Sequence, residues 1–315
     1  MSEEDRKEKV LVAGGAGFIG SHLCDLLLAK GHSVTIIDSY KTGRKQNIQH
    51  LIANKAVEVI EHDIRMPLPN LLQASQIYNL ASPASPKDFA TIGSFILETG
   101  SLGQKNLLEL AKTNDASILF ASTSEVYGDA LVHPQPESYF GNVNPIGARA
   151  CYDEAKRYGE ALSTVYKREF NVRIRIARIF NTYGPRMAPD DGRIIPNFFT
   201  QALARQKLTV YGDGAQTRSY CYVSDMALGL YALMNSNETT PVNIGNPIER
   251  TVKEMATIIN KLTGNNAGYE FLPLPENDPK QRRPDITKAQ QKLGWNPTIN
   301  LERGLDETLK YFKNL

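Results

Sequence analysis

Short apolar runs alternate with amphipathic helical stretches along the first half of the chain. The runs occupy residues 10–13, 33–37, 57–60, 76–80, 117–120 and 172–180, and polar residues follow them. Strands that alternate with helices indicate crossover connections and a parallel sheet. The pattern therefore predicts an α/β fold with a doubly wound, Rossmann-type parallel sheet, in which ligands bind beyond the carboxyl ends of the strands.

The pattern changes after residue 180, where prolines and the turn at 190–192 interrupt it. This loop-rich texture predicts a smaller C-terminal α/β lobe. The apolar segment 222–234 and the run 242–244 nevertheless look able to return to the sheet. We therefore expect a large domain of residues 1–180 plus about 221–247, and a substrate lobe of residues 181–220 and 248–315.

Composition narrows the class of protein. The 315 residues carry a formal net charge of +2, which argues against nucleic acid or a membrane surface as the main partner. No apolar run approaches the length of a membrane span, and the charged stretch 1–10 lacks an apolar signal region. We expect a cytoplasmic protein. Its three cysteines and five histidines are scattered, so reduced thiols and no metal site are expected.

A glycine-rich turn follows the first apolar run. Gly14, Gly17 and Gly20 allow a tight turn and a close approach of the backbone to a pyrophosphate, which the helix N-terminus at Phe18 and Ile19 would attract. A purely structural turn is the alternative. The strand before the turn and the helix after it favour a dinucleotide site.

Acidic residues at the next strand ends support this interpretation. Asp38 ends the second strand about twenty residues after the glycine turn, as the dinucleotide fingerprint requires. It should accept hydrogen bonds from the adenosine ribose and repel a 2′-phosphate, so NAD is favoured, although Arg44 and Lys45 leave NADP open. Asp63 is expected either to contact adenine or to cap a turn. Two further residues at strand ends are candidate cofactor contacts, namely Ile64 and Ala81.

A tyrosine and a lysine four residues apart begin the helix predicted to run to about residue 170. Tyr152 and Lys156 share one helix face. A nearby ammonium and the positive nicotinamide ring would lower the phenol pKa, which lets the phenolate take a proton from a sugar hydroxyl. This motif also occurs on protein surfaces. Behind a dinucleotide fingerprint, and with the hydroxyl-rich strand end 122–124 upstream, it predicts a catalytic pair, with Thr123 as the first choice to bond the same substrate oxygen.

These motifs together resemble the extended short-chain dehydrogenase/reductase superfamily that modifies nucleotide sugars, and within it the UDP-glucuronate decarboxylase (UDP-xylose synthase) family. The similar stretches are TGRKQN (42–47), ASPASP (81–86), STSEVYGD (122–129), NPIGARACYDEAKR (144–157), ARIFNTYGPRM (177–187), DDGR (190–193), LTVYGDGAQTRS (208–219), NIGNPIE (243–249) and RRPDI (282–286). One segment departs, because residues 87–100 lack the tyrosine, proline and Thr-Asn that the family tends to carry.

The resemblance implies a function. It implies that the large domain binds NAD, that the small lobe binds the nucleotide sugar, and that the protein is a homodimer joined by helices including the one that bears Tyr152. The implied reaction converts UDP-glucuronate to UDP-xylose by oxidation at C4, loss of CO₂ and re-reduction at C4. A nucleotide-sugar epimerase, a 4,6-dehydratase and a non-catalytic NAD-sensing regulator are the alternatives.

The dipeptide Ser124-Glu125 bears on the choice among these reactions. Related dehydratases carry Asp-Glu here, where the acid protonates a leaving hydroxyl, and epimerases usually carry small residues and no carboxylate. Ser124 removes that acid, whereas Glu125 would remain beside the sugar ring. A substrate with a carboxylate on C5 becomes a β-keto acid when C4 is oxidised and then loses CO₂ readily. Alternatively, Glu125 is a structural carboxylate bonded to nearby backbone.

The resemblance also implies substrate contacts. It points to Arg282 as a group that reaches the ring from the small lobe, either as a donor through a relayed water or as a stabiliser of enolate charge; a surface arginine before a proline turn is the alternative. Asn181 resembles a substrate contact of the family. For the nucleotide half, Arg218 and Arg193 suit the diphosphate and ribose, and Tyr211 is the candidate to pack on uracil.

Overall fold

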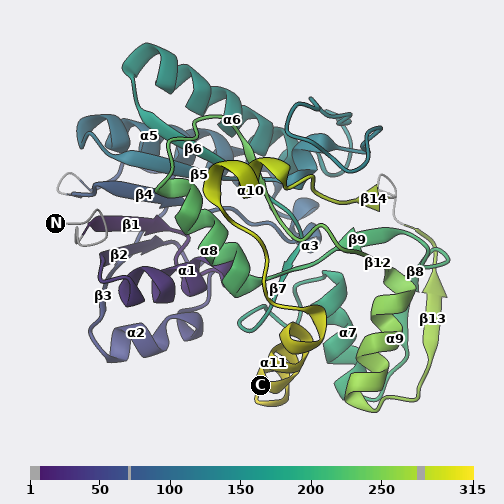
Figure 1. Cartoon of the computed structure of the whole chain (residues 1–315). Coiled ribbons are helices and arrows are strands. Elements are labelled where there is room, and N and C mark those ends of the chain that lie inside the picture. Colours follow the sequence, from purple (N-terminus) through teal and green to yellow (C-terminus); the bar gives the residue numbers. More distant parts are fainter. Residues whose placement is uncertain (1–7, 70–71, 275–280) are drawn as a thin grey trace.

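The protein, seen in a computed structural model that describes residues 8–69, 72–274 and 281–315, is built on a seven-stranded parallel sheet (Figure 1). Its order is β11-β6-β5-β4-β1-β2-β3, and every neighbouring pair is parallel. The strands are β1 (Lys9–Ala13), β2 (Ser33–Asp38), β3 (Val57–Glu61), β4 (Gln76–Asn79), β5 (Ser117–Thr123), β6 (Arg173–Ile179) and β11 (Val242–Ile244). The predicted doubly wound α/β fold is confirmed.

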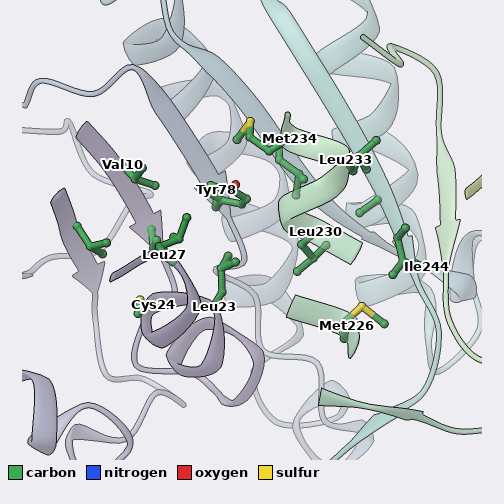
Figure 2. Close-up of a cluster of buried hydrophobic side chains, with 14 of the residues drawn as sticks. Val10, Leu23, Cys24, Leu27, Tyr78, Met226, Leu230, Leu233, Met234 and Ile244 are labelled. Carbon is green, nitrogen blue, oxygen red and sulfur yellow. The ribbon is translucent and has the colours of Figure 1, made fainter. Parts of the chain in front are cut away.

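Helices cover both faces of this sheet because successive strand residues point to opposite sides. In β1, Val10 and Val12 face a core shared with α1 (Phe18–Ala29) and α8 (Val223–Met234). Figure 2 shows Val10 in this core with Leu23 of α1 and Leu230 of α8. Leu11 and Ala13 face a second core closed by α5 (Gln104–Thr113) and α6 (Ala150–Phe170). A strand buried on both faces reads as a continuous apolar run, which is why the run at 10–13 predicts it correctly.

Shorter helices connect the strands of the large sheet. They are η2 (Lys45–Asn47), α2 (Gln49–Ala53), α3 (Pro86–Phe89), α4 (Gly93–Glu98), η3 (Thr99–Gly103) and η4 (Ser124–Tyr127). The last of these begins where β5 ends, and the Thr123 hydroxyl caps it by accepting a hydrogen bond from the backbone N–H of Glu125 at 3.3 Å. This cap turns the chain sharply and leaves Glu125 at the carboxyl edge of the sheet.

A third core lies in the C-terminal part of the chain, between α7 (Ile194–Leu203), α9 (Val252–Thr263) and α11 (Leu301–Lys313). Its strands form three small sheets: β7 (Thr182–Tyr183) with β10 (Cys221–Tyr222), β8 (Leu208–Tyr211) with β13 (Tyr269–Leu272), and β9 (Thr217–Ser219) between β12 (Glu249–Thr251) and β14 (Gln281–Arg282). The last sheet carries Arg218 and Arg282 side by side, and it matters for the site below.

Segments from the C-terminal half of the chain return to the large sheet. β11 pairs with β6, and α8 packs in the core that it shares with α1. α10 (Thr287–Leu293) packs in the same core, and the Trp295 side chain after it donates to the backbone oxygen of Asp225 at 3.0 Å. The division into residues 1–180 plus about 221–247, and 181–220 plus 248–315, stays a prediction. Among the described residues, no helix is both long and apolar enough to cross a membrane; the charged stretch at 1–7 lies outside them.

Candidate active site

A cavity opens at the carboxyl ends of β1, β2 and β4, beside the glycine-rich turn. Gly14 has a φ of +80°, and a Cβ there would come within 2.7 Å of the backbone nitrogen of Ala81. A Cβ on Gly20 would come within 2.1 Å of the Gly14 oxygen. The turn therefore requires glycine at both positions. The predicted cofactor residues that line the cavity are Gly14, Gly17, Asp38, Asp63, Ile64 and Ala81.

α1 begins directly after Gly17, which lines this cavity. Phe18 and Ile19 do not line it: the Phe18 side chain packs against the C-terminal core and the Ile19 side chain against the core shared by α1 and α8, so these two predicted residues have only the free N–H groups of the first helical turn to offer a cofactor. A helix N-terminus with glycines before it suits a pyrophosphate.

Asp38 lies between the cavity and the glycine turn. Its carboxylate accepts hydrogen bonds from the backbone N–H groups of Ala16 at 3.0 Å and Tyr40 at 2.8 Å. Burial raises the pKa of Asp38, although both hydrogen bonds act to lower it. The side chain thus ties the end of β2 to the turn while it lines the cavity.

Asp63 combines the two roles that the sequence left open. It lines the cavity, and its carboxylate also accepts from the backbone N–H of Arg65 at 3.0 Å and from the Arg65 guanidinium at 2.7 Å. Nearby, the buried Nε2 atom of His62 has no hydrogen-bond partner among the described residues, although His62 faces the same cavity. Glycines that exclude a Cβ and an unsatisfied buried nitrogen fit a dinucleotide with a polar base.

Tyr152 and Lys156 lie buried on α6. The Lys156 ammonium donates to the backbone oxygen of Ala121 at 2.7 Å, at the end of β5. A side-chain hydrogen bond joins the Tyr152 phenol to Thr123, and the Phe89 ring stacks on the phenol at 5.2 Å between centroids. β5 and α6 thus bring together the hydroxyl and the phenol that the motifs predicted.

The pKa values of Tyr152 and Lys156 in this structure differ from the expectation. Burial raises the pKa of Tyr152 to about 12, against the lowering effects of Thr123 and Arg193. Burial also lowers the pKa of Lys156 to about 7. The expected lowering of the phenol pKa by a neighbouring ammonium is therefore wrong for the protein alone, because desolvation disfavours both ions.

Glu125 is held by two arginines. Its Oε2 accepts from Arg149 at 2.7 Å and from Arg282 at 3.3 Å, and Arg282 also donates to the Ser124 backbone oxygen at 2.8 Å. Burial would raise the pKa of Glu125, but the charges of Arg282 and Arg149 outweigh it and lower the pKa to about 2. Glu125 is thus a permanent anion bound by side chains, not by backbone as the alternative held.

Arg282 is only 1% exposed, so the interpretation as a surface arginine is wrong. It stands opposite Arg218 in the parallel pairing of β14 with β9. The charge of Arg218, itself buried, also lowers the pKa of Glu125. The charges of three guanidinium groups therefore act on one carboxylate, and guanidinium groups are well suited to bind the carboxylate or phosphate oxygens of an anionic substrate.

Comparison with known proteins places this arrangement in a family. The family model described as GDP-mannose 4,6 dehydratase matches residues 11–308. UDP-glucuronic acid decarboxylase 1 of Danio rerio is 51% identical over 312 residues, covering 99% of this chain and 74% of the relative. UDP-glucuronic acid decarboxylase 2 of Arabidopsis thaliana is 51% identical over 305 residues, covering 97% and 68%. The chain belongs to the UDP-glucuronic acid decarboxylase family.

A solved structure agrees with this family at the level of the fold. UDP-glucuronic acid 4-epimerase from Bacillus cereus, in complex with UDP-glucuronic acid and NAD, aligns with a TM-score of 0.87 and 32% identity, covering 97% of this chain and 99% of that one. The decarboxylase family thus shares its scaffold with an epimerase, so the residues around the sugar must separate the reactions.

The remaining predicted substrate residues lie at different depths. Arg193 precedes α7, pairs with Asp191 at 2.9 Å, and lies close enough to Tyr152 to lower the phenol pKa. Asn181 follows β6 half-buried, and its backbone oxygen accepts from the Cys221 N–H at 2.9 Å. Tyr211 is the last residue of β8 and is 40% exposed, unlike the buried Arg218 and Arg282. Their contacts with substrate stay predictions.

The segment 87–100, which departs from the family pattern, forms α3, α4 and the start of η3 beside the site. Phe89 stacks on Tyr152, and Phe95 lines the cofactor cavity with the Arg65 guanidinium 3.9 Å above its ring centroid. Lys87 pairs with Asp190 at 2.7 Å and so links this segment to the small lobe. The segment thus places one aromatic ring against Tyr152 and another at the cofactor cavity.

Sequence reasoning missed three residues of the site: Phe89, Arg149 and Asp153. Arg149 and Asp153 flank Tyr152 in a stretch that already resembled the family, yet nothing in their identity says that they are directed inward. Asp153 is 6% exposed. A buried charge is unusual unless it is paired or used, and the burial becomes visible only in the fold.

Proposed function

We propose that this chain is a UDP-glucuronate decarboxylase that makes UDP-xylose with a tightly bound NAD. The observation that carries the proposal is the Glu125 carboxylate held as an ion by Arg149 and Arg282 beside Tyr152. Ser124 stands where related dehydratases would carry the acid for a leaving hydroxyl, and Glu125, with a pKa of about 2, cannot take over that role near neutral pH, which disfavours a dehydratase. Guanidinium groups suit a substrate that carries a carboxylate of its own, because their planar fork matches the geometry of a carboxylate.

The residues divide the chemistry between two carbons. The Tyr152 phenol would exchange the C4 hydroxyl proton, with Thr123 bonding the same oxygen and Lys156 behind it. Ser124, whose backbone oxygen is held by Arg282, and Glu125 would lie against the ring near C5. Bound NAD would supply the oxidation at C4 and the reduction that reverses it. Loss of CO₂ from the β-keto acid then needs only a stabilised enolate, and the buried Arg282 guanidinium would stabilise its charge.

The cofactor assignment follows from the cavity. Gly14, Gly17 and the start of α1 would hold the pyrophosphate, Asp38 the adenosine ribose, and Asp63 with Ile64 the adenine edge. Ala81 would contact the cofactor through its backbone, close to Gly14. Mass spectrometry of nucleotide released from the denatured, purified protein should find NAD; NADP or no nucleotide would contradict the assignment.

Labelled substrate tests the reaction. UDP-glucuronate with ¹³C at C6 should yield ¹³CO₂ and UDP-xylose in equal amounts. Deuterium placed at C4 should stay at C4, and unlabelled substrate in D₂O should acquire one deuterium at C5. An epimer of UDP-glucuronate formed without CO₂ would show that the site performs the reaction of its epimerase neighbours instead.

We further propose a cytoplasmic homodimer joined through the face that α4 and η3 share with α6. Leu97 and Leu102 are 43% and 50% exposed on these helices. Apolar side chains on a helical surface suit a contact with a second copy. Light scattering after size-exclusion chromatography should give twice the chain mass, and Leu102→Asp should lower it; a monomeric wild-type protein would contradict the assembly.

A further inference from the structure

Asp153 is buried beside the site with an atom that the protein leaves unsatisfied. It follows Tyr152 on α6 and is 6% exposed. Its Oδ1 is fully buried and has no hydrogen-bond partner within residues 8–69, 72–274 and 281–315. An unpaired buried carboxylate oxygen costs on the order of several kcal/mol, so such a group is either protonated or used.

Charged groups from three other segments act on this carboxyl group. Glu125 of η4 repels its ionised form, whereas Arg149, before α6, and Arg282 of β14 attract it; Glu154, next on the helix, adds a weaker repulsion. Burial, the largest effect, and the Glu125 charge together raise the pKa of Asp153 to about 7. Asp153 therefore gains and loses a proton near neutral pH while Glu125 stays ionised.

The proposed reaction needs such a proton. When CO₂ leaves, the electron pair of the C5–C6 bond remains at C5 and O4 as an enolate, and a new C5–H bond must form. The Tyr152 proton returns to O4, so the C5 proton comes from solvent, and the net reaction consumes one proton. Glu125 carries no proton at neutral pH, and a guanidinium gives one up very poorly.

We propose that Asp153 is a positioning residue that holds this proton and passes it, through one water oriented by Glu125 and Arg282, to C5. The inference rests on the proposed decarboxylase function. In the step, the Asp153 O–H bond breaks, the water relays the proton, and the C5–H bond forms with the enolate electron pair. Asp153 is left as a carboxylate that Arg149 and Arg282 stabilise until solvent restores the proton.

The Asp153→Asn variant tests this role, because an amide keeps the size of the side chain and cannot deliver the proton. Glu154→Gln is the matched control, since Glu154 is the next residue of the same helix and its side chain is 36% exposed. In a single turnover of ¹³C6-labelled UDP-glucuronate, Asp153→Asn should release ¹³CO₂ at nearly the wild-type rate. UDP-xylose formation should fall by roughly 10²-fold or more, because the enolate is not protonated in the site. Enolate that escapes takes a proton at C5 from solvent and is recovered as a UDP-4-keto-pentose.

Several outcomes would overturn the inference. One is that Asp153→Asn gives the same ratio of UDP-xylose to UDP-4-keto-pentose as the wild type. Another is that CO₂ release and UDP-xylose formation fall by the same factor, as they would if the substitution only damaged the structure. The wild type gives a test that needs no variant: its keto-pentose fraction should rise as the pH passes about 7, and a pH-independent fraction contradicts the role. A wild type that releases no ¹³CO₂ refutes the proposed function itself.

Discussion

Replacing Glu125 by Gln should destabilise the protein in a way that depends on pH. The arginines shift the pKa of Glu125 from an ordinary 4.5 to about 2, and each unit corresponds to about 1.4 kcal/mol. Ionised Glu125 thus contributes about 3 kcal/mol to the free energy of unfolding at pH 7, in the range of about 3–5 kcal/mol for breaking a buried pair. Because the folded pKa is depressed, this contribution is present above pH 4.5 and is lost as the pH falls toward 2.

Urea unfolding of wild type and Glu125→Gln from pH 7 to pH 3 measures the effect. The difference in unfolding free energy should be about 3 kcal/mol at pH 7 and should fall to roughly half of that by pH 3. Carboxylates far from the site titrate alike in both proteins, so their contributions cancel in the difference; Asp153, whose pKa depends on Glu125, is the exception. Glu61→Gln is the control, because Glu61 pairs with Lys45 on the open surface and such pairs contribute little.

Asp153 can compensate in part for the lost charge. Without Glu125 to repel it, the Asp153 carboxyl should ionise more readily and pair with the arginines. Glu125→Gln should therefore lower the free energy of unfolding by more when Asp153 is already replaced by Asn. A double-mutant cycle isolates this coupling between the two residues. Equal urea midpoints for wild type and Glu125→Gln at pH 7, or a difference that does not change with pH, would refute the assignment of Glu125 as a buried, arginine-bound anion.

Two further substitutions test the other ends of the site. Tyr152→Phe should lower turnover by roughly 10²–10⁴-fold with UDP-sugar binding retained, because it removes the acceptor for the C4 hydroxyl proton. Tyr158→Phe is the control, since Tyr158 is half exposed on the same helix, and it should have no such effect. A largely active Tyr152→Phe enzyme would disprove the role of Tyr152. Asp38→Ala should lower the affinity for NAD and reduce the preference for NAD over NADP in a direct binding measurement. Asp115→Ala, on the surface, should change neither. An unchanged preference in Asp38→Ala would mean that Asp38 does not face the ribose.

Local patterns were enough to predict the sheet and its ligand edge. The run at 10–13 and the glycine turn after it form a strand and a helix N-terminus as expected, because both depend on residues adjacent in sequence. The same holds for Tyr152 and Lys156, four apart on one helix, and for Thr123 at the end of a buried strand. That the glycine turn, Thr123 and Tyr152 lie at one edge of the sheet follows from the rule that ligands bind at the carboxyl ends of parallel strands.

Interactions between distant segments could not be predicted in this way. Arg282 reaches Glu125 across 157 positions of sequence, and it does so because β14 pairs with β9 in the small lobe. A two-residue strand carries no periodicity from which to infer that pairing. The burial of Arg282 and Asp153, and the desolvation that sets the pKa of Tyr152 and Lys156, depend on the same long-range packing.

The protonation states in the site favour one order of chemical events. Tyr152 stays neutral in the protein alone, so it becomes a base only when a nearby positive charge and a substrate hydroxyl make proton transfer favourable. Glu125 stays ionised throughout, and under the proposed function the substrate carboxylate would lie near its arginines before CO₂ leaves. Departure of that carboxylate would make the net charge beside C5 more positive. That charge would stabilise both the enolate and the ionised form of Asp153, so decarboxylation itself would make Asp153 a stronger acid at the moment when C5 requires a proton.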